Sequence, residues 1–531
     1  MSRFFYKDIL ILGIFVLAAC SPPQLERPEN LMPGRTITLL FTNDFESAFD
    51  PIPAFWREDV EFLGGAAELA TMIDSIRQAE ETVFLFDAGD MFTGTLSNRT
   101  KGELLMEMMI TLGYDAMAIG NHEFDYGWRN FRKQMHRVPF PVLGANIRYK
   151  GTSIPFAQPY AILERNGLRI GVIGVIGQDA RSVTIASNVD SLDFDDPAPV
   201  VHKIMDEIRD QVDLIVLLTH QGKTGPMQTD QEAHPEVWRD FEEDIALSGA
   251  VSGIDVHFAG HAHRGILEPY VHPQTGTLIL QTFGHATHLG YLKLQLDLET
   301  NKIISHQGGL LDVVSNHYTP HPIMKAKIEH YRQQFPELQE VVCTSETRLV
   351  RKYNEESDIG NLFADVLREA TGTELSFFNS GGIRADLPEG EITLGNMLDA
   401  YPFEDKIWKL KMTGKQIKAI LEQALTLERG IIQSSGLQGT YDLAQPKGQR
   451  LVELSVQGVP VSDNQMFTVS TTGVIAEGGD LYTTFTESEV LDSEGPYFGK
   501  VLEAYFREKG NVTIPDRGRL MQENVLELVK D

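Results

Sequence analysis

The chain has 531 residues, which is more than one ordinary hydrophobic core supports, so two or more domains are expected. Its composition, 42% hydrophobic and 23% charged, is typical of a folded soluble protein. The net charge of −29 argues against a nucleic-acid backbone as partner, because proteins that bind one usually carry a basic patch. A small phosphate ester is still compatible, since metal ions and arginines can dominate the field of a local site.

The N-terminus reads as a targeting segment. Two basic residues precede an apolar run of 11 residues, and a membrane-spanning helix would need about 20. We therefore predict a signal peptide over residues 1–19 and a flexible tether over residues 20–35. The run ends in Leu-Ala-Ala-Cys followed by Ser21, which resembles the lipobox of bacterial lipoproteins. This resemblance implies lipidation of Cys20 and a membrane anchor in the bacterial cell envelope, with the protein on the outer membrane facing the periplasm.

Short apolar runs then alternate with helical patterns through the first half of the chain. The runs cover residues 36–42, 82–86, 115–119, 141–147, 168–176, 213–218 and 254–260. Runs of this length, rich in Val, Ile, Leu and Phe, fit strands that are buried on both faces of a layered α/β domain. Residues 277–298 are more typical of antiparallel strands, and we expect them to close this domain.

Five of these runs end in side chains that bind metals or carry protons. In chain order they deliver Asn43, Asp44 and Glu46; Asp87 and Asp90; Asn121, His122, Glu123 and Asp125; His220; and His261 and His263. A solvated turn could explain one such end, and Asp87 could simply cap a turn, but five in order are hard to obtain from turn chemistry alone. Ligands in open α/β sheets bind beyond the carboxyl ends of strands. Carboxylates mixed with imidazoles and an amide oxygen suit divalent ions of intermediate hardness, as in hydrolases with two metals about 3.5–4 Å apart.

The second half begins with a polar stretch of helical periodicity over residues 321–340, which we interpret as a linker helix. It separates a first domain over 36–320 from a second over 341–525. The second domain starts with a predicted helix, a strand and the turn Ser-Gly-Gly, after which comes Arg384. An arginine fork matches two phosphate oxygens at once, so this turn is a candidate phosphate contact.

The motifs ND, GD, GNHEFD, TH and GHAH, followed by SGGIR, PF and GGD, resemble the two-domain 5′-nucleotidase family. The resemblance spans roughly residues 36–520. It implies a four-layer α/β/β/α metallophosphatase sandwich, joined by a helix to a second α/β domain that binds substrate. It also implies a metal-dependent phosphoric ester hydrolase acting on a small molecule, with nucleoside 5′-monophosphates or related nucleotides as the expected substrates. No obligate protein partner is implied.

The same resemblance assigns roles to individual residues. Asp90 bridges two divalent metals. Asp44, Glu46 and His263 complete one metal site, and Asn121, His220 and His261 complete the other. His122 and Asp125 form the catalytic dyad, in which Asp125 orients His122. The residues expected to contact the substrate are Arg351, Asn379, Arg384, Phe403 and Asp480.

This chain departs from the family pattern at two positions. Glu46 stands where relatives usually have His, which lowers the charge of the metal pair and favours Mn²⁺, with Zn²⁺ and Co²⁺ as alternatives. Val474 stands where nucleotide-hydrolysing relatives usually have a second aromatic, so half of a base sandwich is missing. A 2′,3′-cyclic nucleotide phosphodiesterase, a sugar-nucleotide hydrolase and a sulfur-ester hydrolase therefore stay open. A surface receptor without turnover is the remaining alternative, although binding alone would not need the dyad.

Some nearby residues have no place in the family pattern. His257, His285 and His288 are expected to be packing or surface histidines, and Glu123 is expected to lie behind the ligands or in solvent.

Overall fold

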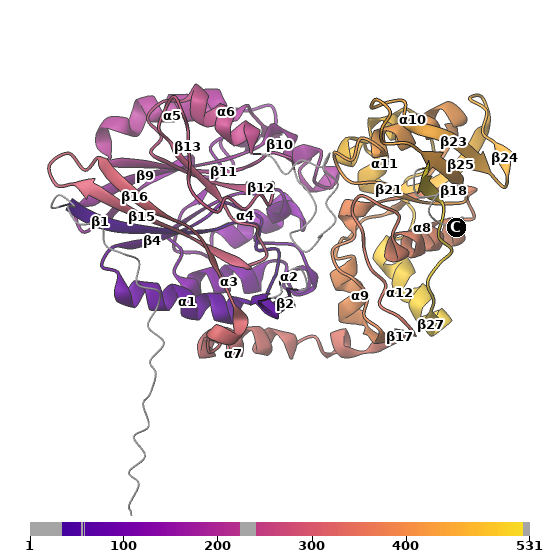
Figure 1. Ribbon diagram of the computed structural model, residues 1–531, viewed down its shortest axis with the longest axis horizontal. Helices are drawn as coiled ribbons and strands as arrows, with labels where there is room; N and C mark the ends of the chain where they lie inside the picture. Colours follow the sequence, from indigo (N-terminus) through magenta and orange to yellow (C-terminus); the bar gives the residue numbers. More distant parts are fainter. Residues whose placement is uncertain (1–33, 55–56, 58, 224–240, 524–531) are drawn as a thin grey trace, which may run out of the picture.

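The computed structural model describes residues 34–54, 57, 59–223 and 241–523. The predicted signal peptide, Cys20 and most of the tether lie outside these residues. Within the described part of the chain, no helix is long and apolar enough to cross a membrane. The first domain stacks two six-stranded sheets, and a second domain lies beyond one end of them (Figure 1).

The first sheet is mixed. Its order is β16 (Ile303–Asp312), β15 (His288–Asp297), β1 (Gly34–Thr42), β4 (Val83–Asp87), β5 (Ala116–Ala118) and β6 (Val142–Leu143). β1, β4, β5 and β6 run parallel, whereas β15 pairs antiparallel with both β1 and β16.

The second sheet has a parallel centre with antiparallel edges. Its order is β13 (Tyr270–Val271), β14 (Leu278–Gln281), β12 (Val256–His261), β11 (Leu214–Gln221), β9 (Leu168–Ile176) and β8 (Tyr160–Arg165). β14 pairs antiparallel with β13 but parallel with β12, so the expectation that residues 277–298 form antiparallel strands is only partly correct for this strand. The segment changes sheets at residues 282–287, and only β15, after this turn, is antiparallel to β1.

The inner faces of the two sheets form a dry core. Phe41 of β1 stacks on Phe258 of β12 with ring centroids 4.1 Å apart, and Phe84, Phe86 and Val216 belong to the same cluster. One outer face is covered by α1 (Ala66–Ala79), α3 (Glu103–Leu112) and α7 (Pro322–Arg332), and the other by α5 (Pro197–Ile208) and α6 (Glu242–Ala250) (Figure 1). These layers confirm the predicted α/β/β/α sandwich.

The second domain is a smaller α/β unit. Its five-stranded sheet has the order β21 (Ile432–Ser435), β18 (Leu375–Asn379), β25 (Met466–Thr472), β20 (Ile407–Thr413) and β26 (Glu489–Asp492). A four-stranded sheet comprises β24 (Val459–Pro460), β23 (Leu451–Val456), β22 (Gln438–Tyr441) and β28 (Leu520–Gln522), and a three-stranded sheet comprises β19 (Gly390–Thr393), β17 (Val341–Ser345) and β27 (Asn511–Val512). The main helices are α8 (Asp358–Thr371), α9 (Leu394–Ala400), α10 (Gly414–Ala424) and α12 (Phe498–Lys509). Shorter elements include α2 (Thr95–Thr100) and α4 (Trp128–Met135) in the first domain and α11 (Gly473–Ala476) in the second.

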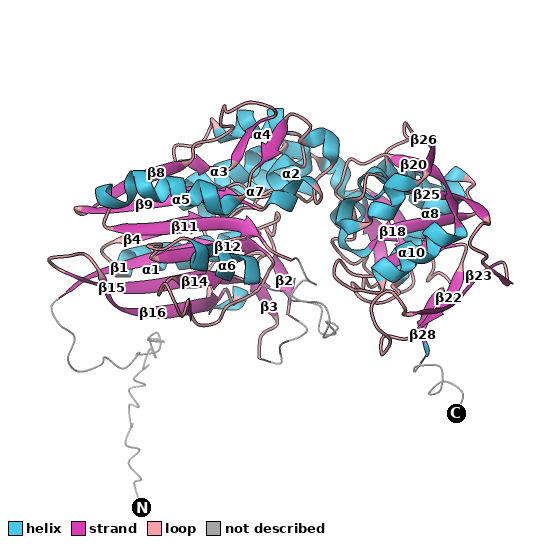
Figure 2. Ribbon diagram, turned by 90° about the horizontal axis from the view of Figure 1, so that it is seen from above, coloured by secondary structure: helices cyan, strands magenta, loops and turns pink. Residues whose placement is uncertain are grey.

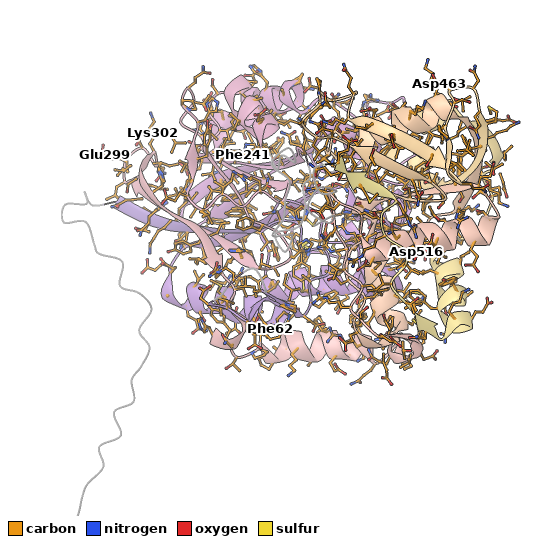
Figure 3. The ribbon with its side chains drawn as sticks, turned by 45° about the vertical axis from the view of Figure 1, so that its right-hand side comes forward. Phe62, Phe241, Glu299, Lys302, Asp463 and Asp516 are labelled. Atoms are coloured by element: carbon orange, nitrogen blue, oxygen red, sulfur yellow. The ribbon has the colours of Figure 1, made fainter. Side chains whose placement is uncertain are left out.

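The two domains are joined by packing as well as by the chain. One apolar cluster runs from α1 and α3 through α7 to α8 and α12. Figure 2 shows the second domain beyond one end of the sandwich. Glu299 and Lys302, in the connection between β15 and β16, lie at the opposite end of the sandwich, whereas Asp463 and Asp516 lie in the second domain (Figure 3). The parallel strands start at that far end, so their carboxyl ends face the second domain.

Candidate active site

The carboxyl ends of the parallel strands are tied to one another by the predicted ligands themselves. The backbone N–H of Asp44, after β1, donates to Gly89 O, after β4, at 2.8 Å. The N–H of His122 donates to the Asp90 carboxylate at 2.7 Å, and the N–H of His261 donates to the Asp44 carboxylate at 3.0 Å. Each contact joins two strand ends, so the turns that carry the ligands also hold the strand ends together.

The backbone of these turns is unusual. Five of the seven predicted ligands have positive φ, between 46° and 70°: Asp44, Glu46, Asp90, His261 and His263. This conformation is uncommon outside glycine and costs about 1–3 kcal/mol per residue, so it persists only where the surrounding structure enforces it. Orienting these side chains toward the site therefore lowers the stability of the fold.

Asp90, His220 and His261 form one candidate metal centre. One possible ligand atom from each lies within 4.8 Å of the others. The Nδ1–H of His220 donates to Ala88 O at 2.8 Å, so Nε2, which lies 2.8 Å from the Asp90 carboxylate, is the nitrogen that can bind an ion beside that carboxylate. Buried His261 Nε2 has no hydrogen-bond partner among the described residues. Converging, unsatisfied nitrogen lone pairs beside a carboxylate fit a divalent cation. Asn121 lines one cavity together with Asp90 and His261.

Asp44, Glu46 and His263 form the second candidate centre. His263 Nε2 lies 3.4 Å from Asp44 Oδ1 and 3.7 Å from Glu46 Oε1. Glu46 Oε2 accepts a hydrogen bond from Arg384 of the second domain. Burial opposes ionisation of Glu46, but Arg384, His263 and His285 together outweigh it and hold the pKa of this carboxyl well below its usual range. Several carboxylates are buried close together here, and buried negative charges need cations nearby. Ions held at the two candidate centres would supply that positive charge.

His122 and Asp125 are placed as a hydrogen-bonded pair. His122 Nδ1 lies 3.0 Å from Asp125 Oδ2, and its Nε2 points toward Glu46 Oε1 at 3.7 Å. Burial lowers the pKa of His122, but the carboxylates of Asp125, Asp90 and Glu46 outweigh it and raise the pKa to about 10. A protonated imidazole beside two candidate metal centres can stabilise negative charge or donate a proton to a departing oxygen.

Glu123 lies behind the predicted ligands, which is the first of its two expected places. It is fully buried and accepts the backbone N–H groups of Asp90 at 2.9 Å, Met91 at 2.8 Å and Gly120 at 2.7 Å. This one carboxylate therefore fixes the turn that carries Asp90 against the turn that carries Asn121. Spacing in the sequence could not reveal it, because its partners are backbone groups of a distant turn.

The predicted substrate contacts line the same cavity as the metal centres and the dyad: Arg351, Asn379, Arg384, Phe403 and Asp480. The Phe403 ring stacks beside His122 with centroids 6.2 Å apart, and Asn379 Nδ2 donates to Asp480 Oδ2 at 2.7 Å. Val474 also lines this cavity, together with Val183 and Ile185 of the first domain. Part of the wall near the predicted base position is therefore aliphatic.

His285 is the residue that sequence reasoning set aside and the structure brings into the site. Its Nε2 lies 3.7 Å from Glu46 Oε2, and its ring centroid is 5.1 Å from that of His263. The signal was present, because His285 lies four residues after the end of β14, a further parallel strand of the second sheet. His257 and His288 instead make side-chain hydrogen bonds away from the metal centres.

Two stacked mixed sheets with buried carboxylates and imidazoles at their carboxyl ends define a metallophosphoesterase. Residues 38–265 match the family model for calcineurin-like phosphoesterases, and residues 339–487 match that for the 5′-nucleotidase C-terminal domain. The chain belongs to the two-domain 5′-nucleotidase family of phosphoester hydrolases. It is 26% identical to the 5′-nucleotidase of Diplobatis ommata, over 91% of this chain and 89% of that protein.

Other relatives agree with this assignment. The chain is 26% identical to a trifunctional nucleotide phosphoesterase of Bacillus subtilis, over 92% of this chain but only 35% of that longer protein. A crystal structure of a 5′-nucleotidase precursor from Thermus thermophilus superposes with a TM-score of 0.79 at 26% identity, covering 92% of this chain and 100% of that one.

Proposed function

We propose that this protein hydrolyses nucleoside 5′-monophosphates, or closely related nucleotide esters, with two divalent metal ions. The observation that carries the proposal is a single cavity between the domains. Its lining includes five of the seven metal-ligand candidates, the His122–Asp125 dyad, and the arginine, aromatic and carboxylate side chains of the second domain. Each part of a nucleotide has a complementary group there, since phosphate suits cations, a base suits an aromatic ring, and ribose hydroxyls suit a carboxylate.

The two ions, when bound, would polarise a phosphoryl oxygen and lower the pKa of a water molecule. Asp44, Glu46 and His263 would hold one ion, Asn121, His220 and His261 the other, and Asp90 both. Mn²⁺, Zn²⁺ and Co²⁺ are all compatible with these donors. Asp125 orients His122, whose Nε2–H faces the centre and can neutralise charge on the phosphoryl group or its leaving oxygen. Arg384 brings a guanidinium from the second domain to the phosphate position.

A panel of substrates tests the proposal directly. Phosphate release would be measured from nucleoside 5′-monophosphates, 2′,3′-cyclic nucleotides and a nucleotide sugar, each with Mn²⁺, Zn²⁺ and Co²⁺. A sulfur-ester substrate would be followed by sulfate release. We expect the 5′-monophosphates to have the highest kcat/KM. A clear preference for another class would redirect the assignment, and metal-dependent binding without turnover would favour the receptor.

Phe403 provides a sharper test of base recognition. Stacking on an aromatic side chain is worth about 1–3 kcal/mol, so Phe403→Ala should lower kcat/KM for a nucleoside 5′-monophosphate about 5–150-fold. With p-nitrophenyl phosphate, which has no nucleobase, the same variant should change little. An equal loss with both substrates would mean that Phe403 only shapes the site beside His122.

We also propose that the protein is lipid-anchored at the bacterial cell envelope and faces the periplasm. The Leu-Ala-Ala-Cys sequence ending at Cys20 supports this location. Cys20→Ala should convert a membrane-bound protein into an uncleaved precursor or a soluble form. If wild type and variant fractionate alike, and neither incorporates labelled fatty acid, the anchor does not exist.

A further inference from the structure

The turn between β14 and β15, residues 282–287, enters the metal-ligand cluster. Asn43 anchors its start, because Asn43 Oδ1 accepts the N–H of Thr282 at 2.8 Å and Asn43 Nδ2 donates to Thr282 O at 3.2 Å. The N–H of His285 donates to Asp44 O at 2.7 Å. A Cβ added to Gly284 would lie 2.9 Å from His263 Nδ1. The turn is thus built against two predicted ligands.

His285 shares the properties of the predicted ligands. Its φ is 51°, the same as that of His263, and only 8% of the residue is exposed. One ligand atom each of Glu46, His263 and His285 lies within 4.8 Å of the others. Neighbouring atoms bound to one ion at bond lengths of about 2.0–2.2 Å are about 2.8–3.6 Å apart, depending on the coordination number. The 3.7 Å separations of Glu46 from His263 and His285 are close to that spacing.

The hydrogen bonding of three neighbouring histidines separates His285 from the others. His257 makes hydrogen-bond contacts through both ring nitrogens, to Thr219 and Ser248, and is fully buried. His288 uses both ring nitrogens as well, with Thr287 and Asp312. His285 Nε2 is buried and, among the described residues, has no hydrogen-bond partner. A buried nitrogen aimed into a cluster of carboxylates and imidazoles needs a partner, and a cation supplies one.

We propose that His285 is a direct ligand, through Nε2, of the ion held by Asp44, Glu46 and His263. This inference rests on the proposed two-metal function and changes the donor set of one site. That site then contains two imidazoles with its carboxylates, so it suits Zn²⁺ and Co²⁺ as well as Mn²⁺. Glu46 Oε1 lies beside His263, and Glu46 Oε2, which also accepts from Arg384, lies beside His285, so the Glu46 carboxylate faces both imidazoles.

The test compares His285→Phe with His288→Phe in the full chain. Phenylalanine keeps a ring of similar size but removes both nitrogens, and His288 is a buried histidine three residues away with its own partners. Each protein would be stripped with a chelator and titrated with Zn²⁺ against a chromophoric chelator. Directly bound nitrogens would be counted by pulsed electron paramagnetic resonance of the Mn²⁺-loaded protein.

We expect His285→Phe to weaken one ion at least about 100-fold, beyond the 10–100-fold typical of outer partners, and to lose one coordinated nitrogen. His288→Phe should retain both ions and the full nitrogen count. Unchanged affinities and nitrogen count in a folded His285→Phe protein would overturn the assignment.

A measurement on the wild type covers the case in which the variant does not fold. In a crystal loaded with Zn²⁺, anomalous scattering should place an ion about 2.0–2.1 Å from His285 Nε2. A separation above about 3 Å would exclude ligation. A wild-type protein that binds no ions would overturn this inference and the proposed function together. A wild type that binds two ions and hydrolyses nucleotides, while His285→Phe binds them equally well, would overturn this inference alone.

Discussion

At the scale of single residues, His122 is the group on which turnover should depend most. Its Nδ1 is held by Asp125, and its Nε2 faces the region between the two candidate metal centres. We expect His122→Asn to retain both ions but to lower kcat about 10²–10⁴-fold, the usual contribution of a positioned acid–base group. Metal analysis beside phosphate-release kinetics checks this. Loss of an ion in the variant would instead make His122 a ligand.

Asp125 should control the protonation of His122. In the metal-free protein the pKa of His122 is raised to about 10, because Asp125 and the nearby carboxylates outweigh burial. For a raised pKa, the stabilisation is complete below about 6.5 and is lost as the pH rises through about 10. Asp125→Asn should therefore lower the pKa of His122 and reduce the loss of stability between pH 6.5 and 10.

Nitrogen chemical shifts of His122 across a pH titration of the metal-free protein measure this pKa directly. Equal His122 titration curves in wild type and Asp125→Asn would show that Asp125 does not set the charge of the ring.

At the scale of elements, the site depends on how closely the ends of β4 and β5 approach. A Cβ at Gly120 would lie 2.3 Å from Asp90 Oδ1 and 2.5 Å from Asp90 N. Gly120→Ala should therefore displace the Asp90 carboxylate, the predicted bridge, and sharply weaken metal binding, while circular dichroism still shows a folded protein.

Gly499, near the start of α12, is the matched control for that substitution. An added Cβ there meets its nearest atoms only at 3.9 Å, so Gly499→Ala should leave metal binding unchanged. If Gly120→Ala binds both ions as tightly as Gly499→Ala does, the turn after β5 is more yielding than this packing indicates.

At the scale of the whole molecule, the linker is part of the first domain's packing. Met324 and Ile328 of α7 are buried, and Lys327 Nζ pairs with Glu107 of α3 at 2.9 Å. Burial of a Met or Ile side chain is worth about 1.5–3 kcal/mol. We therefore expect a fragment of residues 34–335 to be about 3–6 kcal/mol more stable than one of residues 34–320.

Urea unfolding of the two fragments measures this difference. Ile328→Ser in the longer fragment should remove much of the gain, whereas Ile323→Ser should not, because Ile323 is 63% exposed. If both fragments unfold at the same urea concentration, α7 is a tether and does not contribute to the core.

Much of the architecture could be predicted from the sequence, because the spacing of apolar residues and the composition of a segment indicate which of its faces are buried. Runs such as 36–42 and 213–218 contain consecutive apolar residues, which are expected only when both faces of a strand are covered, and this identified the layered sheets. The rule that ligands bind beyond the carboxyl ends of strands pointed to Asp44, Asp90 and His261, because the residue types at a strand end can be read from the local sequence. The expectation for residues 277–298 holds for β15 and only in part for β14, which also pairs parallel with β12, because distant partners decide which sheet a strand joins.

What the sequence alone determined was the class of chemistry, since residue types and their order at strand ends are local facts. Tertiary structure decided which groups share a site. Glu123 braces two turns through backbone N–H groups, Arg384 crosses from the second domain to Glu46, and His285 joins the metal ligands from a turn that no motif marks. These contacts join positions up to 338 residues apart in the chain, and only the folded arrangement of the two sheets and the second domain brings them within bonding distance.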